Sequence, residues 1–214
     1  MATFSEQIDT FGFTMALKAR IARLIRRLFD IHVCTVFTDR QSPHPPVPGY
    51  TLRMLDYKSL QRIHPETAAR FRTAFEKGDV CAGAIVTDPE TGREDLAAYN
   101  MYSLSRTHVD DQIDFEFPEN AFCYSYGTFT FEGHRGKRVA PSVWSFARDQ
   151  RYSKDIEPTL IFYIAMTNLS SLKAGDGKRK VLGYCAFKPG RDRAFIFNSP
   201  ACKRQRVGFV NKVA

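Results

Sequence analysis

Several features that would place the chain in a familiar class are absent from its sequence. One tryptophan and five cysteines occur in 214 residues, and the cysteines, at positions 34, 81, 123, 185 and 202, form no CxxC pair. An odd number of cysteines without metal-ligand spacing argues against a disulfide framework and against a zinc site. We therefore expect reduced and mostly buried thiols.

Long apolar runs and common nucleotide-binding loops are absent as well. No run approaches the roughly 18 residues that a membrane-spanning helix needs. The first ten residues, MATFSEQIDT, lack the basic-then-apolar pattern of a signal peptide. Neither a Walker loop nor GxGxxG nor HExxH occurs, and the five histidines have no metal-ligand spacing. The sequence thus predicts a cytoplasmic protein without a metal site.

Positive charge and phenylalanine are abundant instead. The formal net charge is +8, and phenylalanine occurs 18 times. A hydrophobic content of 43% suits a single domain with a proper core, and the aromatic residues favour a sheet-rich interior. The charge fits nucleic acid, an anionic membrane surface, a phosphate-rich small ligand, or a solvated surface with no partner.

Residues 13–29 have the spacing of an amphipathic helix. The apolar residues near one helical face are Phe13, Leu17, Ile21, Leu24, Ile25 and Leu28, and the cations on much of the remainder are Lys18, Arg20, Arg23, Arg26 and Arg27. We interpret the apolar stripe as the face that packs on the domain, because such spacing usually marks a core. The alternative is a helix lying on an anionic membrane or on nucleic acid.

A proline-rich segment divides the chain. The stretch QSPHPPVPG, residues 41–49, carries four prolines and a glycine and predicts a linker. Residues 1–40 are then an N-terminal extension with a strand at 31–38, and residues 50–214 form the main domain. There the patterns predict strands at 50–56, 80–86, 95–105, 112–117, 121–131, 159–166, 180–188 and 193–199, and helices at 64–79, from 137 onward and at 168–175. The fold class predicted is mixed α/β, with a mostly antiparallel first half.

The segment EGHRGKRVA, residues 132–140, joins a predicted strand to a predicted helix and is the principal candidate site. The first N–H groups of a helix have no intrahelical partner, and the helix dipole favours an anion there. Gly136 allows close approach of the backbone, while Arg135, Lys137 and Arg138 add positive charge. A pyrophosphate would satisfy all of these groups at once. The simpler alternative is a solvated basic turn.

The residues around this segment resemble a known family. TFEGHRGKRVAPSV, residues 130–143, is similar to the acyl-coenzyme A-binding motif of the GNAT N-acetyltransferases, Q/R-x-x-G-x-G/A after a strand. Arg135 matches the first position and Ala140 the last, whereas Arg138 stands where the motif has its central glycine. LIFYIAMTNLSS followed by VLGYCAF resembles the later strand, the Asn-x-x-Ser helix start and the glycine–aromatic pair of the same family.

The resemblance implies a GNAT fold, in which a mixed central sheet flanked by helices splays open between two neighbouring parallel strands. Here these would be the strands at 121–131 and 159–166. It also implies acetyl-CoA or another acyl-CoA as cosubstrate, with its pyrophosphate on the N–H groups of residues 136–140. The cofactor-binding residues it implies are Phe129, Thr130, Phe131, Arg135, Gly136, Lys137, Arg138, Val139, Ala140, Asn168 and Ser171. For Asn168 the alternative is a helix cap.

Acyl transfer to an amine requires a base that takes the amine proton. Relatives in the family use a strand carboxylate and a tyrosine after the Asn-x-x-Ser helix, but residues 168–180 contain no tyrosine. The carboxylates near the predicted site are Asp114, Glu116 and Glu132. Glu116 alternates with phenylalanines, so it either faces a partly buried cleft, which would raise its pKa, or is exposed. Together with Tyr126, which shares a strand face with Tyr124, it is our catalytic candidate.

The function predicted from the sequence is transfer of an acetyl or other acyl group from acyl-CoA to an amine of a small-molecule acceptor such as an amino sugar or amino acid. One alternative is a long-chain acyltransferase that uses an acyl carrier protein. Another is a non-catalytic GNAT-shaped module that binds a membrane or nucleic acid through basic patches. Peripheral membrane contact and a homodimer are left open, and nucleic acid is the partner we least expect.

Overall fold

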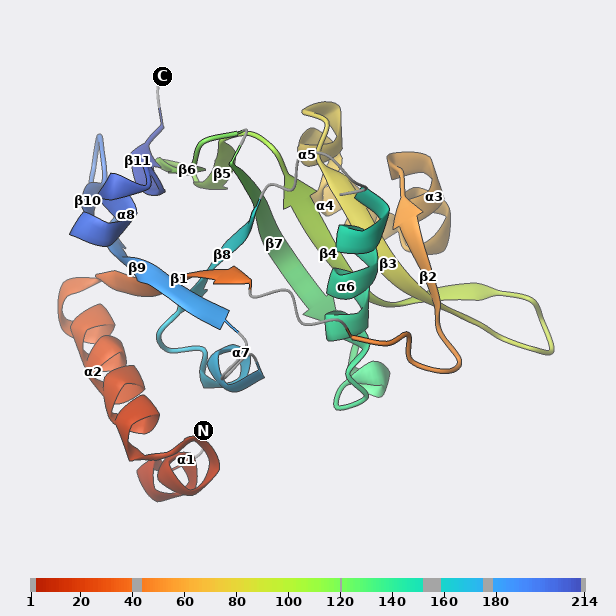
Figure 1. Ribbon diagram of the computed structural model, residues 1–214, viewed down its shortest axis with the longest axis horizontal. Helices are drawn as coiled ribbons and strands as arrows, with labels where there is room; N and C mark the ends of the chain where they lie inside the picture. Colours follow the sequence, from red (N-terminus) through yellow and green to blue (C-terminus); the bar gives the residue numbers. More distant parts are fainter. Residues whose placement is uncertain (1–2, 40–43, 120, 152–158, 175–178, 213–214) are drawn as a thin grey trace. The chain divides into compact units, whose positions relative to one another are not determined.

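The chain divides into two compact units (Figure 1). The computed structural model describes residues 3–39, 44–119, 121–151, 159–174 and 179–212. Unit 1 comprises residues 1–40, 105–122 and 159–214, and unit 2 comprises residues 41–104 and 123–158. Each unit combines antiparallel strands with helices, which confirms the mixed α/β class. No helix within the described ranges is long and apolar enough to cross a bilayer.

Unit 1 is built on a sheet with the strand order β10-β9-β1-β8 and a smaller sheet with the order β11-β6-β5. The strands are β1 His32–Asp39, β5 Thr107–Asp110, β6 Ile113–Glu116, β8 Thr159–Ala165, β9 Arg179–Lys188, β10 Phe195–Asn198 and β11 Gly208–Asn211. The helices are α1 Phe4–Phe11, α2 Phe13–Phe29, α7 Leu169–Ala174 and α8 Pro200–Arg204. Strand β1, which lies in the segment predicted to be an extension, pairs with β8 on one side and β9 on the other. Residues 32–39 are therefore integral to unit 1.

Helix α2 begins and ends where the sequence predicts, but the prediction of its buried face is wrong. Its buried residues are Ala16, Ala19 and Ala22, on the side that packs against β1. The predicted core stripe is exposed instead, with Phe13 at 59%, Leu24 at 55% and Leu28 at 62% of their full accessibility. Small alanines allow a helix backbone to approach a sheet closely. The prediction rested on the spacing of large apolar side chains and took no account of the alanines.

Unit 2 contains the strand order β7-β4-β3-β2, with antiparallel pairing throughout. Its strands are β2 Thr51–Leu55, β3 Val80–Thr87, β4 Glu94–Ser103 and β7 Phe122–Thr130. Its helices are α3 Tyr57–Ile63, α4 Pro65–Arg70, α5 Arg72–Glu76, the short 3-10 helix η1 Glu132–His134 and α6 Val139–Arg151. The predicted hairpin of β3 and β4 is confirmed, and the Asp88 carboxylate accepts hydrogen bonds from two N–H groups in its turn.

Both faces of the unit 2 sheet are covered. On one face the helices before β3 pack on the strands in a core formed by Leu55, Leu60, Ile63, Ala68, Phe71, Cys81, Ile85, Leu96, Tyr99 and Met101. On the other face α6 contacts β3 and β4, where fully buried alanines such as Ala82, Ala84 and Ala98 leave room for it. Helix α6 lies along the sheet in Figure 1. It is thereby fixed by its buried face, and its first turn is held next to the end of β7.

The helix predicted at 64–79 is broken in two. Helix α4 ends before Phe71, whose backbone leaves the helical region, and α5 follows from Arg72. Phe71 is 8% exposed and meets the ring of Tyr99 edge-on at 5.7 Å, so its burial in the core sets the break. Gly78, at φ 88°, ends the segment as expected.

The five cysteines are buried and carry free thiols, as the sequence predicts. Cys185 and Cys202 lie 3.7 Å apart, Sγ to Sγ, and the Cys185 thiol donates to Cys202. This hydrogen bond lowers the pKa of Cys202 and raises the pKa of Cys185. The two strands of the predicted splay, β7 and β8, belong to different units, and the splay itself stays a prediction.

Candidate functional site

The candidate site lies in unit 2, where β7 leaves the core. Residues 122–125 of β7 are buried, and Gly127, Thr128 and Phe129 are exposed. At the transition the register with β4 shifts between Tyr99 and Met101, so that Gly127 and Thr128 together face Asn100. Gly127 adopts φ 62°, which is typical of a β-bulge. The bulge changes the direction of the strand just before its exposed half.

Asn100 holds the bulge from beneath. Its side chain is fully buried, donates to Ser125 Oγ at 3.0 Å and accepts a hydrogen bond from the Thr128 hydroxyl. A buried amide needs such partners, since an unpaired polar group in a core costs roughly 1–3 kcal/mol. Sequence reasoning missed Asn100; a polar residue in the middle of the apolar run DLAAYNMY was the available signal.

Tyr126 precedes the bulge and belongs to a second buried polar group. Its phenol donates to Asp79 Oδ2, and Ser103 donates to Asp79 Oδ1 at 2.6 Å. The ring stacks on Tyr124 at 5.3 Å, so the two tyrosines share a face as predicted. Burial and the hydrogen bond to Asp79 raise the pKa of Tyr126. Asp79, 8% exposed, was also missed, although an acid directly before a buried strand is unusual.

An aromatic layer continues from β7 into the turn. Phe129 and Phe131 meet edge-on at 5.1 Å, and Phe131 also packs on His64 at 4.8 Å. The Phe131 N–H donates to Ala97 O at 3.0 Å, which extends the pairing with β4. Phe129 is 39% exposed, so the outer side of this layer faces solvent.

The turn after β7 is fixed by side-chain contacts. His134 Nδ1 lies 3.0 Å from Tyr50 Oη, and the two rings meet edge-on. Arg135 Nε donates to Thr130 O at 3.1 Å, and its guanidinium lies 5.8 Å from the centre of the Phe129 ring. His134 thus anchors the turn to Tyr50. Arg135 braces the turn against the end of β7.

The backbone of the turn has two residues in the left-handed region. Gly136 adopts φ 76° and Arg138 adopts φ 59°. Arg138 stands at the central glycine position of the motif, and its backbone takes the conformation that glycine adopts most readily. The Arg138 carbonyl accepts from Ser142 Oγ at 3.3 Å, and the same hydroxyl donates to Pro45 O at 2.9 Å. Arg138 therefore combines a charged side chain with a backbone conformation that favours glycine.

Helix α6 follows directly, with 13 residues from Val139. Pro141 lies in its first turn, where a missing N–H costs little. Arg135, Gly136, Lys137 and Arg138 are all exposed immediately before the helix. The arrangement places free N–H groups, the positive end of a helix dipole and three cations around one glycine. Chemically it can hold an anion with several oxygen atoms.

Asn168 and Ser171 belong to unit 1, and their contacts there are local. Asn168 Oδ1 accepts from the Ser171 N–H at 3.2 Å and from Ser170 Oγ at 3.1 Å. This is the contact of an N-cap residue at the start of α7. The Ser171 carbonyl accepts from the Arg179 guanidinium at 2.8 Å. Through its side-chain oxygen, Asn168 thus caps α7, which was the alternative to cofactor binding.

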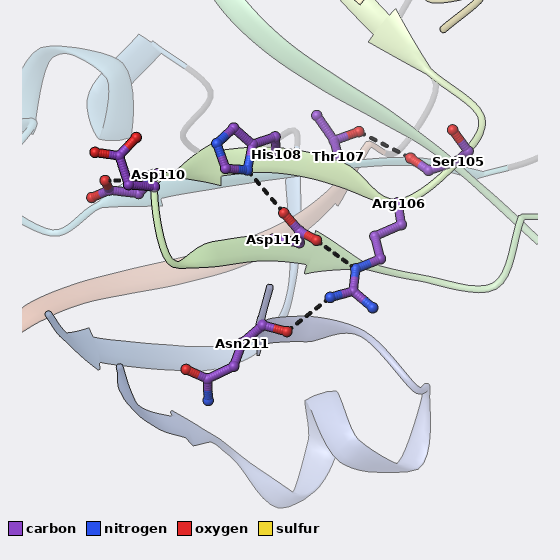
Figure 2. A network of polar contacts seen from close by, with 8 residues as sticks. Ser105, Arg106, Thr107, His108, Asp110, Asp114 and Asn211 are labelled. Carbon is purple, nitrogen blue, oxygen red and sulfur yellow. Dashed lines mark hydrogen bonds and ion pairs between the residues drawn. The ribbon is translucent and has the colours of Figure 1, made fainter. Parts of the chain in front are cut away.

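Two of the candidate carboxylates lie on β6 of unit 1 and have different surroundings. Figure 2 shows Asp114 between His108, whose Nδ1 is 3.0 Å from Oδ1, and Arg106, whose Nε donates to Oδ2 at 2.7 Å. Arg106 also donates to Asn211 O at 2.8 Å, which ties β11 to the pair. Burial raises the pKa of Asp114, but the hydrogen bonds from His108 and Arg106 outweigh it and lower that pKa overall. Asp114 is therefore a structural carboxylate of the small sheet.

Glu116, at the end of the same strand, is exposed. The sequence left two alternatives for Glu116, a partly buried cleft or an exposed position, and the structure shows the exposed position. Glu132, the third carboxylate, lies in η1 and is also exposed. In the described part of the chain no group of acidic, histidine or cysteine side chains could hold a metal ion.

No family model and no curated protein matches the chain. Among solved structures, a protein described as an acetyltransferase from the GNAT family from Novosphingobium aromaticivorans aligns at 13% identity with a TM-score of 0.46, over 73% of this chain and 62% of that one. A functionally unknown conserved protein from Staphylococcus epidermidis aligns at 8% identity with a TM-score of 0.45, over 86% and 79% of the two chains. A tandem GNAT protein from the clavulanic acid biosynthesis pathway aligns at 15% identity with a TM-score of 0.41, over 79% and 58%. The chain thus spans less than two thirds of the length of either GNAT structure, and GNAT is the family that its sequence resembles.

Proposed function

We propose that the protein transfers an acyl group, acetyl in the simplest case, from acyl-CoA to the amine of a small-molecule acceptor. The observation that carries the proposal is the turn between β7 and α6, with Gly136 and Arg138 in left-handed backbone and exposed cations before a 13-residue helix. This turn is also the segment whose sequence resembles the acyl-CoA motif. We place the reaction in the cytoplasm, where buried thiols stay reduced.

The roles of the cofactor-binding residues follow from their contacts. The N–H groups of residues 136–140 would receive the pyrophosphate, with the side chains of Lys137 and Arg138 adding charge. The exposed Phe129 of β7, with the half-buried Thr130 and Phe131 that follow it, would pair with the pantetheine amides. Arg135 is already bonded to Thr130 O and is proposed to shape the turn. Asn168 would use its amide nitrogen toward the pantetheine, because its oxygen caps α7.

The chemical step joins the amine nitrogen to the thioester carbonyl carbon and breaks the carbon–sulfur bond. A base takes the proton from the amine, and the sulfur leaves as a thiolate that then gains a proton. We propose the exposed carboxylate of Glu116 as the base. Tyr126 holds its proton too firmly to give it to a thiolate, since a thiol has a pKa of about 8.5 and burial raises the pKa of this phenol. Its proposed role is to position the bulge beside the reacting carbonyl.

Calorimetric titration with acetyl-CoA tests the cofactor site directly. We expect saturable binding that weakens as the salt concentration rises, because phosphates meet cations at an exposed turn. Absence of binding at millimolar acetyl-CoA would sink the proposal. Release of free thiol from acetyl-CoA in the presence of an amine panel then tests transfer. The same assay with a long-chain acyl thioester separates the acyl carrier protein alternative.

A further inference from the structure

Helix α2 of unit 1 has two apolar faces, and one of them is exposed. Its alanine face, Ala16, Ala19 and Ala22, is buried against the unit. The opposite face carries large side chains that are between 37% and 62% exposed: Phe13, Leu17, Ile21, Leu24 and Leu28. At about 100° per residue these five side chains fall within an arc of roughly 80°. They form one continuous stripe, which we call the outer stripe.

The charge around the outer stripe has a single sign. Helix α2 contains five cations and no acidic residue. Arg20 and Arg23 make contacts with α1, through the Phe4 ring at 4.7 Å and Gln7 Oε1 at 3.0 Å. Arg27 and Lys18 flank the outer stripe, roughly 40° and 60° beyond its two edges at about 100° per residue, and both are exposed. Arg26 is exposed on the opposite side of the helix. The ion pairs found among the described residues of unit 1 include none of these three cations. An apolar stripe bordered by unneutralised cations therefore faces outward.

A cavity of about 440 Å³ opens beside the first turn of this helix. Its wall contains Phe13 and Lys18 from α2, together with Arg179, Val181 and Tyr184 from β9. Val181 and Tyr184 are themselves 47% and 42% exposed. The cavity shares Phe13 with the outer stripe, and both apolar and cationic side chains line it.

We propose that the outer stripe of α2 is a docking surface for an anionic lipid bilayer, on which the helix lies parallel to the surface. Charge complementarity selects this occupant: the stripe would enter the acyl region, and the bordering arginines and lysine would meet lipid phosphates. A second copy of the chain would bring like charges together along the same border. Nucleic acid would pair with the cations but leave the five apolar side chains in water. The proposal goes beyond acyl transfer and does not depend on it.

Sedimentation with vesicles tests the proposal on the full chain. We expect partition onto vesicles of phosphatidylcholine mixed with phosphatidylglycerol, and little onto phosphatidylcholine alone. The double variant Leu24→Ser, Leu28→Ser should lower the partition coefficient by about tenfold or more. The double variant Lys18→Gln, Arg27→Gln should lower it by roughly fivefold per cation. All four side chains are exposed, so the fold should persist, and circular dichroism checks this.

The matched control is Phe195→Ser, Phe197→Ser, which removes two exposed aromatic side chains from β10 of the same unit. This variant should bind as the unaltered protein does. Failure of the unaltered chain to bind the anionic vesicles, or equal binding to neutral ones, would overturn the proposal. So would a dimer in sedimentation equilibrium that the leucine variant dissociates, or binding to duplex DNA without binding to vesicles. Acetyl-CoA binding is measured separately, so a negative vesicle result leaves the proposed function intact.

Discussion

The phenol of Tyr126 donates a hydrogen bond to the buried carboxylate of Asp79. Tyr126 is the residue immediately before the bulge at Gly127. Asp79 directly precedes β3, and Tyr126 lies on β7. The bond therefore connects the start of β3 to the strand that leads into the candidate site. It fixes the position of β7 at the point where the strand turns outward.

Tyr126→Phe should destabilise the protein more at neutral pH than at high pH. Removal of the phenol leaves Asp79 with Ser103 as its remaining hydroxyl donor, at a cost of about 1–3 kcal/mol in the free energy of unfolding. Because the folded pKa of Tyr126 is raised, its contribution is present below the unfolded pKa of about 10 and is lost as the pH rises above it. Urea unfolding at several pH values measures this. Tyr184→Phe, at an exposed position, is the control and should change little.

Gly136→Val should weaken acetyl-CoA binding by about tenfold while the domain stays folded. A β-branched residue is strongly disfavoured at φ 76°, so the turn must change its backbone conformation. Among the described residues beyond its chain neighbours, no atom lies within 4 Å of a Cβ at this position, so the strain there comes from the backbone. Gly133→Val is the matched control, because Gly133 has equally open surroundings and is not in the left-handed region. Equal acetyl-CoA affinities for the two variants would contradict the proposal and favour the alternative of a solvated basic turn.

Arg138→Gly and Arg138→Ala should differ in stability although both remove the same charge. Alanine keeps the penalty of the left-handed backbone at φ 59°, while glycine relieves it, so the glycine variant should be more stable by about 1 kcal/mol. Both should bind acetyl-CoA more weakly at low salt than the unaltered protein. Thermal unfolding and titration of the pair measure the two effects. Identical unfolding temperatures would contradict the backbone assignment of Arg138.

Asp114→Asn should make the free energy of unfolding depend less on pH in the acidic range. The folded pKa of Asp114 is lowered, so its contribution is fully present above the unfolded pKa of about 3.9 and is lost as the pH falls through the folded value. The variant should lose about 1–2 kcal/mol at neutral pH and little at low pH, where the carboxyl is protonated. Asp111→Asn, at an exposed position in the same β5–β6 turn, is the control. If the free energy of unfolding of the two variants depended on acidic pH in the same way, Arg106 and His108 would not stabilise the carboxylate.

Most strands and the long helices could be predicted because their sequence patterns are strong. The 17 residues of α2 and the hairpin of β3 and β4 have clear periodicity and clear ends. Several short elements were missed: β5 and β11 have four residues each and α8 has five, too few for a clear period. Helix α1 did carry a signal, the capping box of Thr3 and Glu6, which was overlooked.

The candidate site was located by motif, but its supports could not be read from the sequence. Gly136 and Arg138 stand in a recognisable pattern, so a turn between a strand and a helix was predicted there, and such a turn joins β7 to α6. Their role in binding stays a prediction. Asn100 and Asp79 support β7 from positions 28 and 47 residues away along the chain, through Thr128 and Tyr126. Contacts at such separations depend on strand register, and a single sequence does not reveal which register the strands adopt.

The two faces of α2 respond differently to substitution. A larger side chain at Ala16, Ala19 or Ala22 would push the helix away from β1, so these positions are confined to small residues. The outer stripe contributes little to folding, so leucine, isoleucine and phenylalanine there can be exchanged with almost no loss of stability. What unit 1 binds can therefore diverge between related chains while the turn that would hold the acyl donor in unit 2 stays the same.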